Sequence, residues 1–294
     1  MSPGVEGLEQ LQPQPPPLPP PFPGFLQAVG LFALWIGVSL VVLLPFFVID
    51  QVRGDHVFAT HPASLGLATI ASSVSVFAVA RRQTGRSWRV LWNESEPVPL
   101  DVLWFGSTLI FGLLMFGVLT FLWLERGFPG IVPKLEYGFG QSRLIAFLVI
   151  VVIAPICEET IFRGVFLRGF VDRYGFAKGL MLSALLFAVA HGSPARIPHT
   201  FALGCALGWL YHGTRSLWVS IAAHALNNLI AGIAILAGLS AGSSGPRKPA
   251  PPFHPSELGL AAFALLAIGL SIWRLNLLFA ASREGTPPPP TAIE

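Results

Sequence analysis

Eight long stretches with few or no charged residues divide the chain, and they restrict its fold more than any other feature. A helix needs about 20 apolar residues to cross a bilayer, and most of the stretches approach or exceed that length. They lie at residues 28–49, 63–80, 102–124, 144–170, 179–195, 198–214, 217–238 and 257–280. We therefore expect an all-α, polytopic integral membrane protein, a bundle of about eight transmembrane helices.

The composition agrees with this fold and excludes several other classes of protein. Hydrophobic residues make up 53% of the chain and charged residues only 11%, whereas soluble domains carry roughly 25% charged residues. The net charge of +3 does not indicate a nucleic-acid partner, because Lys and Arg beside membrane helices usually reflect topology. We expect the lipid bilayer as a partner and no nucleic acid. Cys157 and Cys205 lie inside apolar stretches, where we expect small buried hydrophobic residues rather than a disulfide.

The segments between the apolar stretches predict the orientation and the boundaries. If eight helices alternate from a cytoplasmic N-terminus, the inner segments hold eleven Lys and Arg residues and the outer segments seven, which together are all 18. The positive-inside rule then places both termini in the cytoplasm, and in a bacterium the membrane is the plasma (inner) membrane.

We expect a Pro-rich disordered tail, N-terminal transmembrane helices, a core with the polar residues described below, a Gly/Ser/Pro-rich external loop, a final transmembrane helix and a second disordered tail. In that order, these parts are residues 1–24, 25–140, 141–240, 241–256, 257–280 and 281–294.

The fourth stretch contains three charged residues, Glu158, Glu159 and Arg163. Each costs about 2.5–3.5 kcal/mol at the centre of a bilayer, so we expect them to face the bundle interior or a water-filled cavity. Glu159 and Arg163 are four residues apart and can form an ion pair on one helix face. Glu158 lies about 100° away around the helix, where its free carboxylate could act as a general base. The alternative is a buried ion-pair network that only holds helices together.

Two further stretches contain polar residues at informative positions. His191 is followed by a glycine and a nearby proline, which place it close to a helix C-terminus. His224 and Asn228 are four residues apart, so two hydrogen-bond donors on one helix face could stabilise an oxyanion. The alternative for this pair is hydrogen bonding between helices, which is common in membrane proteins. Asn227 lies on a different face, and we expect it to be the residue that joins helices.

Together, these residues form three motifs on separate apolar stretches. The motifs are Glu158-Glu159-x-x-x-Arg163, Phe187-x-x-x-His191 and His224-x-x-x-Asn228. In this order they resemble the CPBP family, which comprises type II CAAX prenyl endopeptidases and bacteriocin-processing enzymes and is also called the Abi family. The resemblance spans about residues 140–235, so residues 141–240 are expected to be the CPBP-type catalytic core. We expect Phe187 to pack rather than to take part in chemistry.

The resemblance implies an all-α intramembrane endopeptidase in which the polar residues act as three pairs. One pair activates the attacking water, one stabilises the oxyanion and one supports the site. In that order, the pairs are Glu158 with His191, His224 with Asn228, and Glu159 with Arg163. The resemblance favours a glutamate-dependent mechanism with no metal cofactor, and its alternative is a zinc ion held by Glu158, His191 and His224. The substrate would be a peptide or a membrane protein.

Two other functions compete with proteolysis. A non-catalytic scaffold or bacteriocin-immunity protein of the same family would be expected to lack motif residues, yet every motif position is present. A secondary transporter with a proton relay would show inverted repeats, and the sequence shows none. For the protease, we expect a polar cavity that opens to the cytoplasm, with Glu158 and His191 within hydrogen-bond reach of one water. Most other charged residues lie in loops and tails, where we expect them to set orientation and little else.

Overall fold

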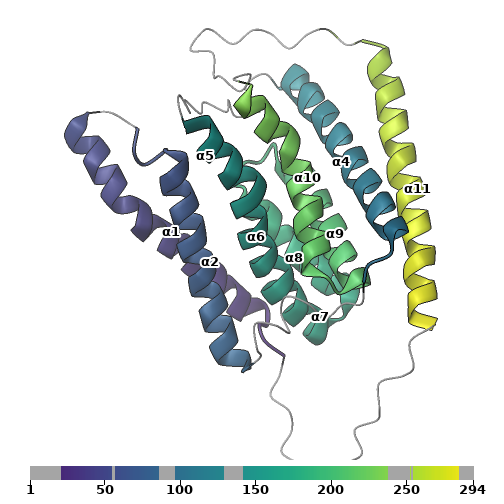
Figure 1. Ribbon diagram of the computed structural model, residues 1–294, viewed down its shortest axis with the longest axis horizontal. Helices are drawn as coiled ribbons and strands as arrows, with labels where there is room; N and C mark the ends of the chain where they lie inside the picture. The colour runs from purple at the N-terminus through teal and green to yellow at the C-terminus, as the bar shows by residue number, and fades with distance from the viewer. Residues whose placement is uncertain are drawn as a thin grey trace, which may run out of the picture.

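The computed structural model shows an all-α bundle, as the apolar stretches predict (Figure 1). It describes residues 21–54, 57–85, 97–128, 142–237, 252 and 254–284, and within these ranges it contains no strand. Most residues of the two predicted tails and of the predicted external loop lie outside the described ranges. These residues are 1–20 and 285–294 of the tails, and 241–251 and 253 of the loop.

Eight helical runs account for most of the described chain, and each overlaps one of the eight predicted stretches. They are α1 (Phe25–Arg53), α2 (Pro62–Thr84), α4 (Leu100–Gly127), a continuous run over 143–174, α8 (Phe176–Ala190), α9 (Ile197–Thr214), α10 (Leu217–Leu236) and α11 (Ser256–Glu284). The continuous run consists of α5 (Arg143–Leu148), η3 (Val149–Ile153), α6 (Ala154–Glu159), η4 (Thr160–Leu167) and α7 (Arg168–Tyr174). Five of the described helices are long and apolar enough to cross a membrane: α1, α2, α4, the continuous run and α11. The chain is therefore an integral membrane protein.

The helix of the apolar stretch 179–195 is shorter than the stretch itself. It ends at Ala190, and His191 follows as the cap residue, as the glycine and proline after it predict. Gly192 adopts a φ of 64°, which a helix cannot contain, and Pro194 follows it in the turn that leads to α9. With 15 residues, α8 is about 22 Å long, which is less than the roughly 30 Å hydrocarbon thickness of a bilayer.

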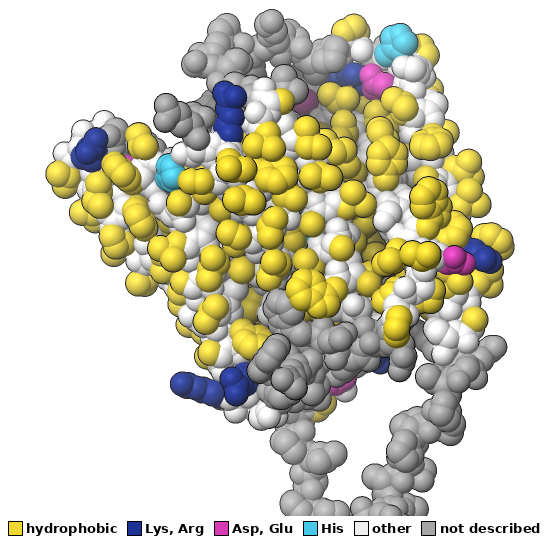
Figure 2. Space-filling model, viewed as in Figure 1, with side chains coloured by type: hydrophobic (Ala, Val, Ile, Leu, Met, Phe, Trp, Pro, Cys, Tyr) yellow, Lys and Arg dark blue, Asp and Glu magenta, His cyan; other side chains and the backbone are white. Residues whose placement is uncertain are grey.

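The surface of the bundle suits lipid rather than water. Figure 2 shows a face covered largely by hydrophobic side chains, with most of the charged ones near its upper and lower edges. Leu40 and Trp104 are among many large apolar side chains that are more than half exposed. A soluble monomer rarely exposes contiguous apolar patches of this extent. Residues 21 and 284 lie at the same end of the bundle (Figure 1), and their cytoplasmic location stays a prediction.

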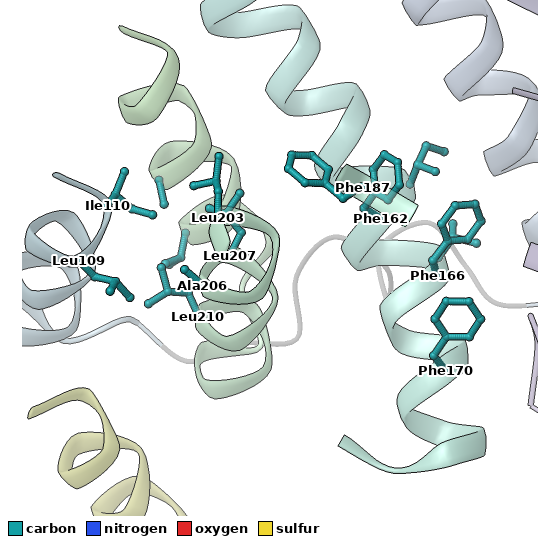
Figure 3. Packing of buried hydrophobic residues seen from close by; sticks show 14 of the residues in the cluster. Leu109, Ile110, Phe162, Phe166, Phe170, Phe187, Leu203, Ala206, Leu207 and Leu210 are labelled. Atoms are coloured by element: carbon teal, nitrogen blue, oxygen red, sulfur yellow. The ribbon is translucent and has the colours of Figure 1, made fainter. Parts of the chain in front are cut away.

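The core holds the polar run against its neighbours through aromatic packing. Phe162, Phe166 and Phe170 lie at four-residue intervals along one face of η4 and α7, and Phe187 of α8 packs on Phe162 (Figure 3). The ring centroids of Phe162 and Phe187 are 5.2 Å apart in an edge-to-face arrangement, which aromatic pairs favour. All four side chains are fully buried.

A glycine turn fixes α8 close to α7. Gly175, between the two helices, has a φ of 80°, a conformation that side chains with a Cβ rarely adopt. One turn into α8, a Cβ at Gly179 would lie 2.7 Å from the backbone nitrogen of Val171, so only glycine allows this approach. The close contact places α8 directly beside the helix that carries the acidic pair.

Two charged residues outside the fourth stretch also join helices. Arg126, in the last turn of α4, makes a two-pronged ion pair with Glu257 in the first turn of α11, with nitrogen–oxygen distances of 2.6 and 2.7 Å. The Nε1 of Trp123 donates a further hydrogen bond of 3.0 Å to Glu257. This cluster joins α4 to α11, which pack along one another (Figure 1).

Candidate active site

The acidic pair lies at the end of α6, a six-residue α-helical segment between two π-helical segments, η3 and η4. Single π-turns in helices occur frequently at functional sites. In each π segment, a neighbouring helix donates a side-chain hydrogen bond to a backbone carbonyl. The Nδ2 of Asn228 in α10 donates to Ile150 at 3.0 Å, and the Oγ of Ser183 in α8 donates to Phe162 at 2.9 Å. The acidic pair is thus held from both sides along the helix.

Glu159 is the centre of a buried hydrogen-bonded cluster. Its side chain has no exposed surface. Its Oε1 accepts hydrogen bonds of 2.8 Å from Nη1 of Arg163 and from Nδ1 of His224, and its Oε2 accepts one from the Oγ of Ser220. The predicted ion pair between Glu159 and Arg163 is confirmed. Ser220 was not among the predicted site residues, although it precedes His224 by four residues and therefore shares its helix face.

Arg163 extends this cluster to two more helices. Its guanidinium is buried, and Nη2 donates a 3.0 Å hydrogen bond to the carbonyl of Gly204 in α9. The guanidinium carbon also lies 4.6 Å from the ring centroid of Phe187 in α8, which is a cation–π contact. The Nε of Arg163 has no hydrogen-bond partner among the described residues. Arg163 therefore connects α8, α9 and α10 through Phe187, Gly204 and the shared Glu159.

The contacts of His224 determine which of its ring nitrogens faces the site. Because Glu159 is paired with Arg163, its carboxylate only accepts hydrogen bonds, so Nδ1 of His224 is the donor. The opposite nitrogen, Nε2, lies 3.9 Å from Oε2 of Glu158. The side chain of Glu158 is 19% exposed and that of Glu159 is 0% exposed. Glu159 is thus paired locally, as predicted, and Glu158 is partly accessible; its projection into a cavity stays a prediction.

His191, at the end of α8, is linked to this cluster through Phe187. It is the residue that caps the helix C-terminus, as predicted. Its Nδ1 donates a 2.8 Å hydrogen bond to the carbonyl of Phe187, so Nε2 is again the nitrogen left for other partners. The ring of Phe187 lies edge-to-face against both histidines, at 4.8 Å from His191 and 5.5 Å from His224. Phe187 packs as predicted, and the residues it packs on are the site residues.

The prediction for the two asparagines is reversed. Asn227 was expected to join helices, but its amide donates to the neighbouring Asn228 at 3.1 Å. Asn228 makes the bond between helices, to Ile150 in η3. One N–H of Asn228 is used in this bond.

The grouping of side chains bears on the predicted alternative of a zinc site. Within the described ranges, no three His, Cys, Asp or Glu side chains are close enough to hold a metal ion. Glu158, His191 and His224 therefore do not form a three-ligand site in this structure.

A cavity of about 460 Å³ opens between α4, α8, α9 and α11, lined mainly by apolar residues that include Leu113, and none of the six predicted site residues borders it. The expected polar cavity beside Glu158 and His191 stays a prediction.

The fold and this cluster define an all-α membrane protein with a carboxylate–histidine site inside its helical bundle. Residues 140–230, which contain every site residue described above, match the sequence model of the family described as "Type II CAAX prenyl endopeptidase Rce1-like". The resemblance to the CPBP family is thereby confirmed for this part of the chain.

A second comparison links the chain to a bacterial protein. It is 26% identical over 132 residues to the protein named "Putative membrane peptidase YdiL" of Bacillus subtilis (strain 168). The match covers 37% of this chain and 54% of that protein, so the chain spans about half the length of the curated relative it matches. No solved structure matches the chain.

Proposed function

We propose that this protein is an intramembrane endopeptidase that hydrolyses peptide bonds with a water activated by Glu158 and His191. The observation that carries the proposal is the arrangement of the two glutamates and His224. Glu158 is partly accessible and lies 3.9 Å from Nε2 of His224, while the buried Glu159 holds the opposite side of that imidazole. The match of residues 140–230 to an endopeptidase family and the similarity to a protein named as a membrane peptidase support the same function.

The proposed reaction uses Glu158 as the general base. Its carboxylate takes a proton from the water as the water oxygen attacks the scissile carbonyl carbon, and His191 orients that water through its Nε2. The carbon–nitrogen bond breaks when the tetrahedral intermediate collapses, and the proton held by Glu158 passes to the leaving amine. Glu159 is not suited to be the general base, because it is buried and already accepts three hydrogen bonds.

The proposed oxyanion site consists of His224 and Asn228. An imidazolium or amide N–H directed at the developing negative charge lowers the barrier, and removing one such donor typically costs about 10²–10³ in kcat. In the free protein, Asn228 is held in place by its hydrogen bond to Ile150, and His224 by its bond to Glu159. These bonds hold both side chains before a substrate binds, which supports the proposed role. Because Nδ1 of His224 already donates to Glu159, the ring would offer a second N–H as an imidazolium.

We propose that the reaction is glutamate-dependent and needs no metal ion, which the resemblance to the CPBP family favours. A chelator added to the purified protein tests this point directly. Activity that persists in the chelator supports the metal-free reaction. Activity that is lost and then restored by zinc contradicts it.

The main test is cleavage of quenched fluorescent peptides by the purified full-length protein, compared with Glu158→Gln and His191→Ala. General acid–base catalysis contributes about 10²–10⁴-fold, so we expect a loss of that size in both variants with unchanged thermal stability. Asp101→Asn is the matched control, because Asp101 is an exposed acid in the first turn of α4, outside the cluster. Full activity in Glu158→Gln would contradict the proposed base.

The choice of substrates separates the proposed protease from a non-catalytic relative. Each peptide is prepared both unmodified and with an isoprenoid on a C-terminal cysteine, so that a requirement for the lipid is measured rather than assumed. Cleavage of either form that depends on Glu158 supports the protease. Binding of peptides without cleavage under any condition would support a scaffold of the same family.

A further inference from the structure

We infer that Ser220 is a positioning residue of the catalytic site, which acts through Glu159 to hold His224 in its working orientation. This inference rests on the proposed function for its effect on catalysis. Ser220 is fully buried in α10, one helical turn before His224. Its hydroxyl donates to Oε2 of Glu159, the carboxylate oxygen that the other two donors do not use.

The two carboxylate oxygens of Glu159 accept hydrogen bonds from different partners. Oε1 accepts hydrogen bonds from both Arg163 and His224, at 2.8 Å each. Oε2 accepts from Ser220 alone among the contacts of the described residues. Arg163 thus uses a single N–H on this carboxylate, although arginine and carboxylate groups often pair through two parallel hydrogen bonds.

The unused donor of Arg163 shows what the serine prevents. Nε of Arg163 is buried and has no partner in the described part of the chain, and Glu159 lies directly beside the same guanidinium. A buried donor without a partner is costly, so a carboxylate free to turn would gain by also accepting from Nε. Ser220 holds Oε2 on the side of α10, and this keeps Oε1 in reach of both Arg163 and His224.

Loss of the Ser220 hydroxyl would therefore release the carboxylate rather than only remove one hydrogen bond. With Oε2 unpartnered, rotation of Glu159 toward Arg163 satisfies Nε and withdraws Oε1 from Nδ1 of His224. The Nδ1–H of His224 then has no fixed acceptor, and its Nε2 is no longer directed at Glu158. Ser220 also has a long 3.4 Å contact to the carbonyl of Leu207, which gives the hydroxyl a second acceptor but does not hold Glu159.

The first test measures kcat and KM separately for Ser220→Ala, Ser220→Thr and Ser271→Ala. Loss of a partner that orients a catalytic histidine is expected to lower kcat about 10–100-fold, by analogy with outer-shell partners of metal-bound histidines, with KM little changed. The threonine variant keeps the hydroxyl and is expected to restore most of the rate. Ser271→Ala is the matched control, because Ser271 is equally buried, in α11, and its Oγ has no hydrogen-bond partner among the described residues.

A second measurement does not depend on activity. A double-mutant cycle of Ser220→Ala and His224→Ala, followed by thermal unfolding in detergent, reports whether the two residues act together. Residues connected through one carboxylate are expected to be non-additive. Additive effects, or a fall in kcat for Ser220→Ala no larger than for Ser271→Ala, would overturn the inference. Absence of any hydrolysis by the wild type, with coupling still present, would instead refute the proposed function and leave the positioning contact standing.

Discussion

Two glutamates in this protein each accept hydrogen bonds from an arginine and from an aromatic or imidazole N–H, yet they are arranged differently. Glu257 joins the ends of α4 and α11, and Arg126 binds both of its oxygens in the two-pronged geometry. Glu159 lies in the middle of the bundle, and Arg163 binds only one of its oxygens. The side chain of Glu257 is 11% exposed and that of Glu159 is 0% exposed.

The two binding geometries indicate different roles. The Arg126–Glu257 pair joins two helices, whereas the Arg163–Glu159 pair also orients the imidazole of His224. At Glu257, the arginine takes the geometry that suits the two side chains best. At Glu159, one donor of Arg163 has no partner among the described residues, and the carboxylate is shared with His224 and Ser220. Buried ion pairs often contribute little net stability compared with apolar residues of similar size. The arrangement at Glu159 is therefore better explained by the position it gives His224 than by stability.

The largest effect is expected for Glu159→Gln, which leaves the guanidinium of Arg163 as an uncompensated buried charge. Breaking a buried pair by removing one partner costs about 3–5 kcal/mol, and the free energy of unfolding should fall by that amount. Chemical unfolding in detergent micelles measures it. The double variant with Arg163→Met is expected to recover much of the loss, because it removes the orphaned charge. A double variant less stable than Glu159→Gln would contradict this account of the cluster.

A smaller effect is expected for Phe187→Leu, which keeps most of the buried volume but removes the ring. The ring lies under the guanidinium of Arg163 and edge-on to His191 and His224. Swaps between apolar side chains of similar volume cost under about 1.5 kcal/mol, and the lost cation–π contact adds up to about 2 kcal/mol. Thermal unfolding measures the change. Phe166→Leu is the control, since Phe166 is equally buried and packs on Phe162 and Phe170 instead.

Much of the fold was predictable because lipid imposes simple rules on the sequence. A backbone in hydrocarbon must satisfy its own hydrogen bonds, so each long apolar stretch becomes a helix, and all eight did. The end of α8 was predictable from the kind of residue rather than from mean hydropathy, because a glycine and a proline closely follow His191. In the structure the positive φ of Gly192 fixes the boundary.

Most residues of the candidate site were predicted from the sequence, but several of the hydrogen bonds between its helices were not. Helical spacing correctly paired Glu159 with Arg163, because both lie on one helix. It missed Ser220 and assigned the bond between helices to Asn227 instead of Asn228. These contacts depend on how α10 lies against a run whose turns widen into π segments, and spacing within a single helix carries no information about that. Arg126 and Glu257 were missed for the same reason, since 130 intervening residues separate them in the sequence.

The smallest effect is expected for Glu257→Gln, and its dependence on salt sharpens the comparison with Glu159. Glutamine keeps an oxygen that can accept from Trp123 and Arg126 but removes the negative charge. The contact between the two helices therefore weakens, but no unpaired charge is left buried in the core. Because this pair lies at the helix ends, added salt screens it, and the Debye length falls to about 3 Å at 1 M. The difference in unfolding temperature between wild type and Glu257→Gln should therefore shrink as salt is raised. The corresponding difference for Glu159→Gln should stay constant, since no ions reach that carboxylate. Equal salt dependence of the two variants would remove the distinction between the two clusters.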